Sequence, residues 1–317
     1  YNAGILLRDA GDKNRALGVF RQLIDKYPKS ELFRDATVAA TDIYKNAGDS
    51  VGAADVLERA AARTSDPGEG ANLIFEAATR ARAANSPQTA ELYEKFLRLA
   101  PPSDLRTTSA RIYVARAYAR QGRTAEAERL AREMISRSPM GGTAEEQQQV
   151  QLALAEAHLI LGDASLRRFE SVRLSEPLSA TLKKKQQALE EALGYLRTAA
   201  NFGFADVSLA SFYKIGYAQL DFANAVIQAP HPRSLTAEQR DQYDVLLREQ
   251  MRPYREGAEK AFRGTLQQAK SSGIENEWTS RARSALVEFG GEHAGAPPAA
   301  APGGGSQAPV SGPPSTS

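Results

Sequence analysis

The sequence predicts an all-α protein in which helical hairpins stack one after another as a solenoid. The first observation behind this prediction is a set of residues that tolerate the left-handed backbone closing a helix, spaced 37 residues apart: Gly11, Gly48, Asn85 and Gly122. The second is a further break, lying between these residues, that recurs along the chain. The third is that apolar residues between the breaks keep helical rather than alternating spacing.

The stretch FRQLIDKYPKSELFRDA, residues 20–36, contains the second kind of break. An amphipathic helix runs up to Pro28, which lacks an amide donor and disfavours helical geometry in the residue before it. Ser30 is the expected N-cap of a new helix that begins at once. Later in the chain, Ser86 and Pro87 supply the same restart chemistry, an N-cap followed by a first-turn proline. The chain is therefore expected to end one hairpin and start the next within a few residues.

Each expected second helix carries two core residues one helical turn apart. The first of them is small, and the second is usually larger. Such pairs let two antiparallel helices approach closely while the gap between them is filled. These pairs are Ala16 with Phe20, Ala53 with Leu57, Thr89 with Tyr93, and Ala127 with Ala131. The breaks that follow them eight residues later are Pro28, Ser65, Pro101 and Pro139.

The second half keeps this pattern with longer connections. Gly162 is the expected end of a further helix, 40 residues after the preceding break. Residues 163–187 and 229–253 then lengthen two hairpins, which should project from the stack. The second insertion contains a capping box, Thr236 with Gln239, which predicts the start of a long helix.

A last helix over residues 276–289 should close the stack with Trp278 as its anchor, because a solenoid must cover its final apolar face. Residues 290–317 are dominated by Gly, Pro, Ala and Ser and predict a disordered tail. The predicted organisation is regular hairpins over 1–162, extended hairpins with a capping helix over 163–289, and this tail.

The composition narrows the possible functions. The chain has 317 residues, of which 42% are apolar and 25% charged, as in globular proteins generally. Its 40 basic and 38 acidic residues nearly cancel, so no global field favours nucleic acid or a membrane surface. Cysteine is absent, which excludes disulfides and thiol catalysis. No run approaches 18 apolar residues, so no segment is expected to span a membrane.

The hairpins resemble the tetratricopeptide repeat family, whose first helix carries Leu-Gly followed by an aromatic residue. The corresponding positions here are Ala3-Gly4 with Leu7, Ala40-Thr41 with Tyr44, Val114-Ala115 with Tyr118, Leu154-Ala155 with His158, and Ile215-Gly216 with Gln219. A weaker first helix is built on Ala77, Ala78 and Ala81. The resemblance implies a right-handed superhelix that binds other proteins in a groove lined by its first helices.

A narrower resemblance concerns Gram-negative cell envelopes. Residues 20–36 are similar to repeats of outer-membrane assembly lipoproteins and Tol-associated coordinators. Residues 169–286 resemble repeat proteins of gliding-motility and Tol-like machinery in myxobacteria and relatives. This resemblance implies a non-catalytic scaffold in an envelope complex, in the periplasm or associated with the outer membrane. The alternative is a superhelical accessory domain of a peptidoglycan-processing enzyme whose catalytic lobe lies outside this chain.

Candidate catalytic residues are few. His158 occupies an aromatic position of a first helix, His231 lies in a Pro-rich loop, and His293 falls in the tail. None has the paired spacing of a helical metal site, and no glycine-rich phosphate loop occurs between a strand and a helix. We therefore expect no enzymatic activity, no metal and no cofactor.

The family's groove positions transfer to this chain repeat by repeat. Arg116 and Arg120 lie one helical turn apart, so both can face one carboxylate. The lysine, asparagine and arginine set with which some family members clamp peptide C-termini is not reproduced. The full set of expected groove residues is Asp42, Lys45, Asn46, Ile112, Arg116, Arg120, Glu156, Tyr213 and Tyr217.

A basic cluster on the first projecting hairpin is the alternative binding surface. It is either a solvated helix face or a docking edge for an acidic protein surface or an anionic envelope polymer. Its residues are Arg167, Arg168, Lys183, Lys184 and Lys185.

Overall fold

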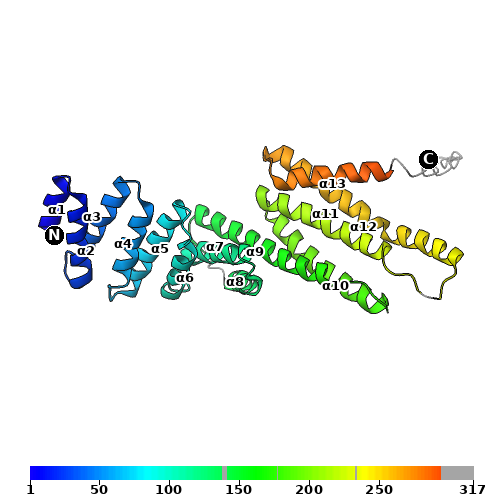
Figure 1. Ribbon diagram of the computed structural model, residues 1–317, viewed down its shortest axis with the longest axis horizontal. Helices are drawn as coiled ribbons and strands as arrows, with labels where there is room; N and C mark the ends of the chain where they lie inside the picture. The colour runs from blue at the N-terminus through cyan, green and yellow to red at the C-terminus, as the bar shows by residue number, and fades with distance from the viewer. Residues whose placement is uncertain (138–140, 177, 233, 294–317) are drawn as a thin grey trace, which may run out of the picture.

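The computed structural model describes residues 1–137, 141–176, 178–232 and 234–293, and it is an elongated stack of helices without strands in this part of the chain (Figure 1). The predicted all-α solenoid is confirmed. The helices are α1 (Asn2–Asp9), α2 (Lys13–Lys26), α3 (Phe33–Asn46), α4 (Ser50–Ala61), α5 (Pro67–Ala83), α6 (Thr89–Leu99), α7 (Arg106–Arg120), α8 (Thr124–Arg137), α9 (Ala144–Ser171), α10 (Leu178–Asn201), α11 (Ala205–Ile227), α12 (Ala237–Ser272) and α13 (Glu277–His293).

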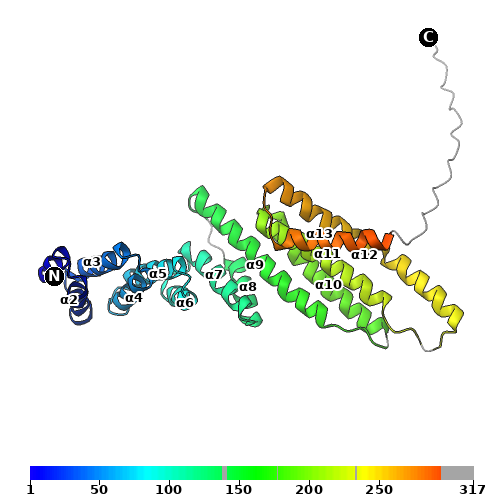
Figure 2. The same cartoon turned by 45° about the horizontal axis from the view of Figure 1, so that its top comes forward.

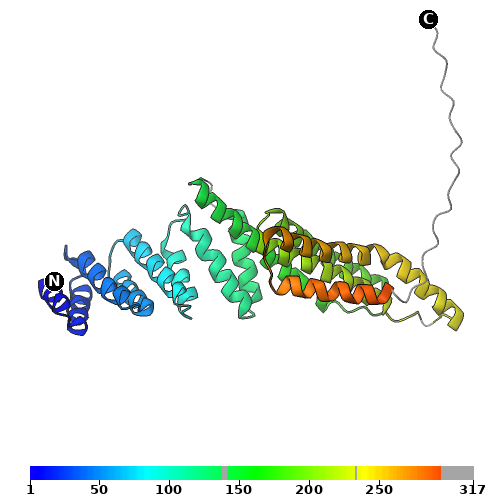
Figure 3. The same cartoon turned by 90° about the horizontal axis from the view of Figure 1, so that it is seen from above.

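Consecutive helices pack against each other along the whole stack. The odd-numbered helices from α1 to α11 are the first helices of six hairpins, and the even-numbered helices are their partners. Each second helix also packs on the first helix of the next hairpin, which joins the hairpins into one layer after another (Figure 3).

The predicted helix ends at the 37-residue spacing are confirmed. Gly11, Gly48 and Gly122 have φ values of 85°, 72° and 76°, and Asn85 has a φ of 52°. Among the described residues, Asn85 is the one residue other than glycine that has a positive φ. At each of these positions the left-handed conformation stops one helix and turns the chain back into the next.

The paired core positions of the second helices are buried as predicted. The aromatic ring of Phe20 is fully enclosed, as is the small side chain of Ala16 one turn earlier. Tyr93 contacts the rings of Phe75 and Tyr113 on neighbouring first helices. The remaining members are equally buried: Ala53, Leu57, Thr89, Ala127 and Ala131. Pro139 lies outside the described residues.

The predicted N-caps at Ser30 and Ser86 are wrong. Helix α3 begins at Phe33, and the hydroxyl of Ser30 accepts a hydrogen bond from the Leu32 amide at 3.2 Å. Helix α6 begins at Thr89, whose hydroxyl donates to the carbonyl of Ser86 at 2.7 Å. In both places the chain makes a closed turn before the helix starts, so the serine organises the turn rather than the first helical amides.

Gly162 is not a helix end, which corrects the prediction for this position. It lies inside α9, which continues to Ser171, and a Cβ atom at Gly162 would stand 2.7 Å from Cδ2 of Leu196 on α10. The glycine therefore admits a closely packed neighbouring helix. The left-handed glycine of this region is Gly203, at the end of α10, with a φ of 79°.

The long second hairpin and the closing helix are present. The capping box of Thr236 and Gln239 is formed in both directions and opens the 36-residue helix α12. Helix α13 packs against α12 and α11 and runs to His293, four residues past the predicted end at Phe289. The rest of the predicted tail, 294–317, lies outside the described residues.

The hydrophobic core is divided into clusters along the stack, and α9 belongs to more than one of them. Ala157 and Leu161 of α9 join a cluster that reaches back to α4. Leu166 and Phe169, farther along α9, join a cluster that extends to α12. Figure 2 shows α9 running without interruption from the α7–α8 hairpin to the side of α10. Position 162 thus lies between two clusters but within one helix.

Replacement of Gly162 by alanine should destabilise the protein, although alanine is the better helix former. The new methyl group would overlap the buried side chain of Leu196, and such overpacking costs about 1–3 kcal/mol. Gly194 on α10 is exposed and has free space around it, so Gly194→Ala should instead stabilise by about 0.5–1 kcal/mol. Urea unfolding of both variants measures these changes, and equal stabilisation by the two would refute the close-packing role of Gly162.

Candidate functional site: a groove along the first helices

Two hollows open between first helices in the part of the stack from α3 to α9. The α3–α5 hollow, of about 360 Å³, is lined by residues that include Val38 and Asp42 of α3 and Leu73 and Glu76 of α5. The α7–α9 hollow, of about 620 Å³, lies between α7 and α9, with the C-terminal end of α5 at its edge. Both hollows are on the surface where the resemblance to tetratricopeptide repeats predicts the ligand groove.

The α7–α9 hollow brings together four residues predicted for the groove: Ile112, Arg116, Arg120 and Glu156. The hydrophobic spacing of α7 explains their placement, because Ile112 is buried while Arg116 and Arg120 follow it one and two turns later and are exposed. Glu156 arrives from α9, the first helix of the next hairpin. Whether a partner binds here stays a prediction.

The charges of this hollow are unbalanced. Arg116 donates to the carboxylate of Glu156 at 3.2 Å. Arg120 on α7 and Arg82 at the end of α5 line the same hollow, and neither has an ion-pair partner among the described residues. The lining therefore holds three guanidinium groups and one carboxylate, so the hollow retains two positive charges.

Burial raises the pKa of the Glu156 carboxyl, and the nearby Arg116 and Arg120 only partly oppose this effect. The carboxylate is shielded from water by the surrounding first helices, with a side chain that is 21% exposed. Protonation of Glu156 would release Arg116 from its ion pair.

The α3–α5 hollow is smaller and has an apolar floor. Val38 keeps 53% of its surface exposed there, although it is a large apolar residue. Arg34 and Glu69 pair across the hollow at 3.1 Å. Asp42 lies at the rim, whereas Lys45 and Asn46, also predicted for the groove, are exposed at the end of α3 and do not line this hollow.

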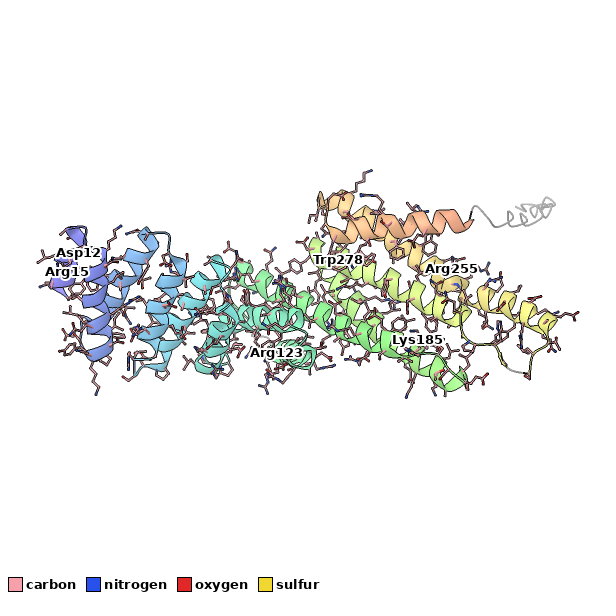
Figure 4. All side chains as sticks on the ribbon, viewed as in Figure 1. Asp12, Arg15, Arg123, Lys185, Arg255 and Trp278 are labelled. Carbon is pink, nitrogen blue, oxygen red and sulfur yellow. The ribbon has the colours of Figure 1, made fainter. Side chains whose placement is uncertain are left out.

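Tyr213 does not lie in an open groove, which corrects the prediction for the sixth hairpin. Its ring packs against Phe262 of α12 and against Trp278 of α13, with ring centroids 5.7 and 5.6 Å apart. The closing helix therefore covers this part of the first-helix surface, and Trp278 anchors it as predicted (Figure 4). Tyr217 stacks beside Tyr213, and burial raises the pKa of its hydroxyl to about 12.

Lys185 is not part of an exposed docking edge. It is 4% exposed, and its ammonium group donates to the carbonyls of Phe169 and Val172 at 3.3 Å while pairing with Asp221. It therefore holds the C-terminal end of α9 against α10, where Figure 4 labels it.

The other members of the basic cluster differ in their surroundings. Arg168 pairs with Glu128 at 2.8 Å and with Glu191 at 3.0 Å, so it connects α8, α9 and α10. Arg167, Lys183 and Lys184 are exposed. Their role as a docking edge stays a prediction.

Comparison with known proteins supports the repeat assignment at the start of the chain. Residues 1–30 match the tetratricopeptide repeat model. No match was found among curated proteins. A solved circular tandem repeat protein, described as having novel repeat topology and enhanced subunit contact surfaces, is 15% identical, with a TM-score of 0.28. That match covers 86% of this chain and 65% of the other, and its TM-score does not establish a shared fold.

Sequence reasoning missed Arg82 and Val38, although the repeat period points to both. Arg82 follows Lys45 by 37 residues, and Ile112 follows Val38 by 74, which is two periods. The first helix of the third hairpin, α5, matches the repeat pattern only weakly, and this concealed both correspondences. Aligning the repeats by the glycine and asparagine breaks would have identified both residues.

The described residues contain no cluster of three or more His, Cys, Asp or Glu side chains that could hold a metal ion. His158 is a packed spacer between the rings of Tyr195 and Phe202, and burial lowers the pKa of its imidazole. Among the helices of the described ranges, none combines the length and apolar character needed to cross a bilayer.

Replacement of Lys185 by methionine should lower the free energy of unfolding by about 1–3 kcal/mol, because two carbonyls and Asp221 lose a charged partner. Lys184→Met, at the exposed neighbouring position, should change it by less than about 0.5 kcal/mol. Thermal or urea unfolding distinguishes the two. A Lys185 variant as stable as the Lys184 variant would mean that the buried contacts contribute nothing.

Stability should depend on pH through Glu156. Because folding raises the pKa of this carboxyl, the native state holds a proton that the unfolded chain has lost at pH values between the unfolded and the folded pKa. The stability that this bound proton contributes is therefore fully present below about pH 4.5, the ordinary pKa of the group. It is lost as the pH rises through the raised pKa of the folded state. Glu156→Gln cannot ionise, so its stability relative to the native protein should increase over this rise. Urea unfolding from about pH 4 to 7 checks this, with Glu190→Gln at an exposed position on α10 as the matched control.

Proposed function

We propose that the protein is a non-catalytic scaffold that binds an acidic, extended segment of a partner protein in the groove along its first helices. The observation that carries this proposal is the α7–α9 hollow, whose lining holds Arg82, Arg116 and Arg120 from two helices but only one carboxylate, that of Glu156. Guanidinium groups bind carboxylates through paired, charge-assisted hydrogen bonds, so this hollow suits aspartate and glutamate side chains.

The rest of the hollow fits a protein segment better than a small anion. Its lining includes the amides of Asn85 and Gln149, which can bond to a peptide backbone. It also includes the side chains of Tyr113 and Leu152, which supply apolar contact area beside the charges. A mixture of apolar area, aromatic and arginine side chains and hydrogen-bonding groups is typical of protein–protein interfaces.

We further propose that this scaffold works in a bacterial cell envelope, in the periplasm or at the outer membrane. The support for this location is the resemblance of residues 20–36 and 169–286 to repeat proteins of envelope machinery. Fractionation of cells that produce the protein from its own gene tests the location. Recovery in the cytosolic fraction alone would contradict it.

The groove proposal predicts that Arg82→Ala combined with Arg120→Ala weakens binding of an acidic peptide at least about tenfold. Two lost charge-assisted contacts of about 1 kcal/mol each exceed the 1.4 kcal/mol that equals one decade in affinity. Both residues lack ion-pair partners among the described residues, so stability should change by less than about 0.5 kcal/mol per site. Fluorescence anisotropy with a glutamate-rich nonapeptide, and with its glutamine counterpart, measures the effect.

Two further double variants serve as controls. Arg129→Ala with Arg137→Ala removes two exposed arginines from the outer helix α8 and should leave affinity unchanged. Lys183→Ala with Lys184→Ala tests the rival docking edge on α10. If only the lysine variant loses binding, the projecting hairpin is the binding surface and the groove proposal is wrong.

A further inference from the structure

The two hollows of the groove are built on one plan with the charge reversed. Asp42 and Arg116 are 74 residues apart, which is two repeats, and so are Val38 and Ile112. In the α3–α5 hollow, an apolar residue is followed one turn later by an acid. In the α7–α9 hollow, the matched apolar residue is followed one turn later by a base.

The charges that remain unpaired have opposite signs in the α3–α5 hollow and the α7–α9 hollow. Within the α3–α5 hollow, Arg34 pairs with Glu69 and Arg80 pairs with Glu76, at 3.1 and 2.8 Å. Asp42 has no ion-pair partner in the described part of the chain, so this hollow keeps one negative charge. The α7–α9 hollow keeps two positive charges, as described above.

We infer that the partner segment is bipartite, with an apolar residue next to a lysine or arginine in the α3–α5 hollow and acidic residues in the α7–α9 hollow. This inference rests on the proposed function and adds a second subsite to it. Val38, 53% exposed beside Leu73, supplies the apolar contact, and Asp42 selects the cation. A segment of uniform negative charge meets repulsion at Asp42, so the paired hollows discriminate among acidic segments.

The repeat geometry sets the spacing of the two features. Each step between consecutive first helices, from α3 to α5 and from α5 to α7, passes through an intervening second helix. Packed helices lie about 8–10 Å apart, so positions two repeats apart along the first helices are separated by at least about 16–20 Å. An extended chain advances about 3.3 Å per residue. The cationic and acidic features should therefore be at least about five or six residues apart in the partner.

A blocked peptide containing Lys-Leu, five serines and Glu-Asp-Glu, together with its reversed sequence, tests the inference in an anisotropy assay with the full chain. Asp42→Asn should weaken the better binder about two- to fivefold, the range expected for an exposed ion pair. The same variant should not weaken a peptide in which the lysine is replaced by glutamine. Asp55→Asn, at an exposed position on α4, is the matched control and should affect neither peptide.

Val38→Thr tests the apolar contact with little change of shape. It should weaken the peptide carrying leucine and leave unchanged one in which the leucine is replaced by serine. If Asp42→Asn and Val38→Thr affect all peptides equally or not at all, the bipartite groove is refuted.

The acidic subsite is tested separately, because it alone predicts weaker peptide binding by the Arg82→Ala, Arg120→Ala double variant. Loss of that dependence would overturn the proposed function and this inference with it.

Discussion

The close approach of two helices within a hairpin is the constraint on which the rest of the structure depends. At Gly4, a Cβ atom would stand 2.5 Å from the ring of Phe20, and at Gly216 it would stand 2.7 Å from the ring of Phe262. At these two positions the first helix has no Cβ atom, so a phenylalanine ring of the second helix can pack directly against its backbone. Because the pairs of helices are tightly packed, the first helices line up on one side of the stack, and the groove lies on this side up to the point where α13 covers α11.

Ion pairs between successive hairpins fix how this face is arranged. Asp25 with Arg59 and Glu58 with Lys95 connect second helices, while Arg34 with Glu69 and Arg116 with Glu156 connect first helices. The members of each pair are separated by 34 to 40 residues, close to the repeat period. Exposed pairs of this kind contribute little to stability individually. Their repetition on both sides of the stack favours one rotation between neighbouring hairpins, and thereby one curvature of the groove.

The parts of the fold that could be predicted from the sequence are those set by local chemistry. Glycine and asparagine at helix ends act within a few residues, so their period predicted the hairpins correctly. Gly162 was misread because a glycine that ends a helix and one that admits a neighbour look the same in sequence, and only contact with Leu196 on α10 distinguishes them. Lys185 was expected in solvent, as most lysines are, since its carbonyl partners at the end of α9 become visible only in three dimensions. The charge of the α7–α9 hollow likewise required Arg82 from another repeat.

The continuity of α9 has a consequence for how the molecule comes apart. Its 28 residues span about 42 Å, and their side chains are divided between a core cluster that begins at α4 and another that ends at α12. In solenoids, stability is otherwise a sum of local terms, and terminal repeats can fray independently. A rigid rod shared by two clusters cannot lose its structure on one side without exposing apolar surface on the other. The middle of this protein should therefore open as a single cooperative block, which leaves the N-terminal hairpins as the region where partial unfolding is least costly.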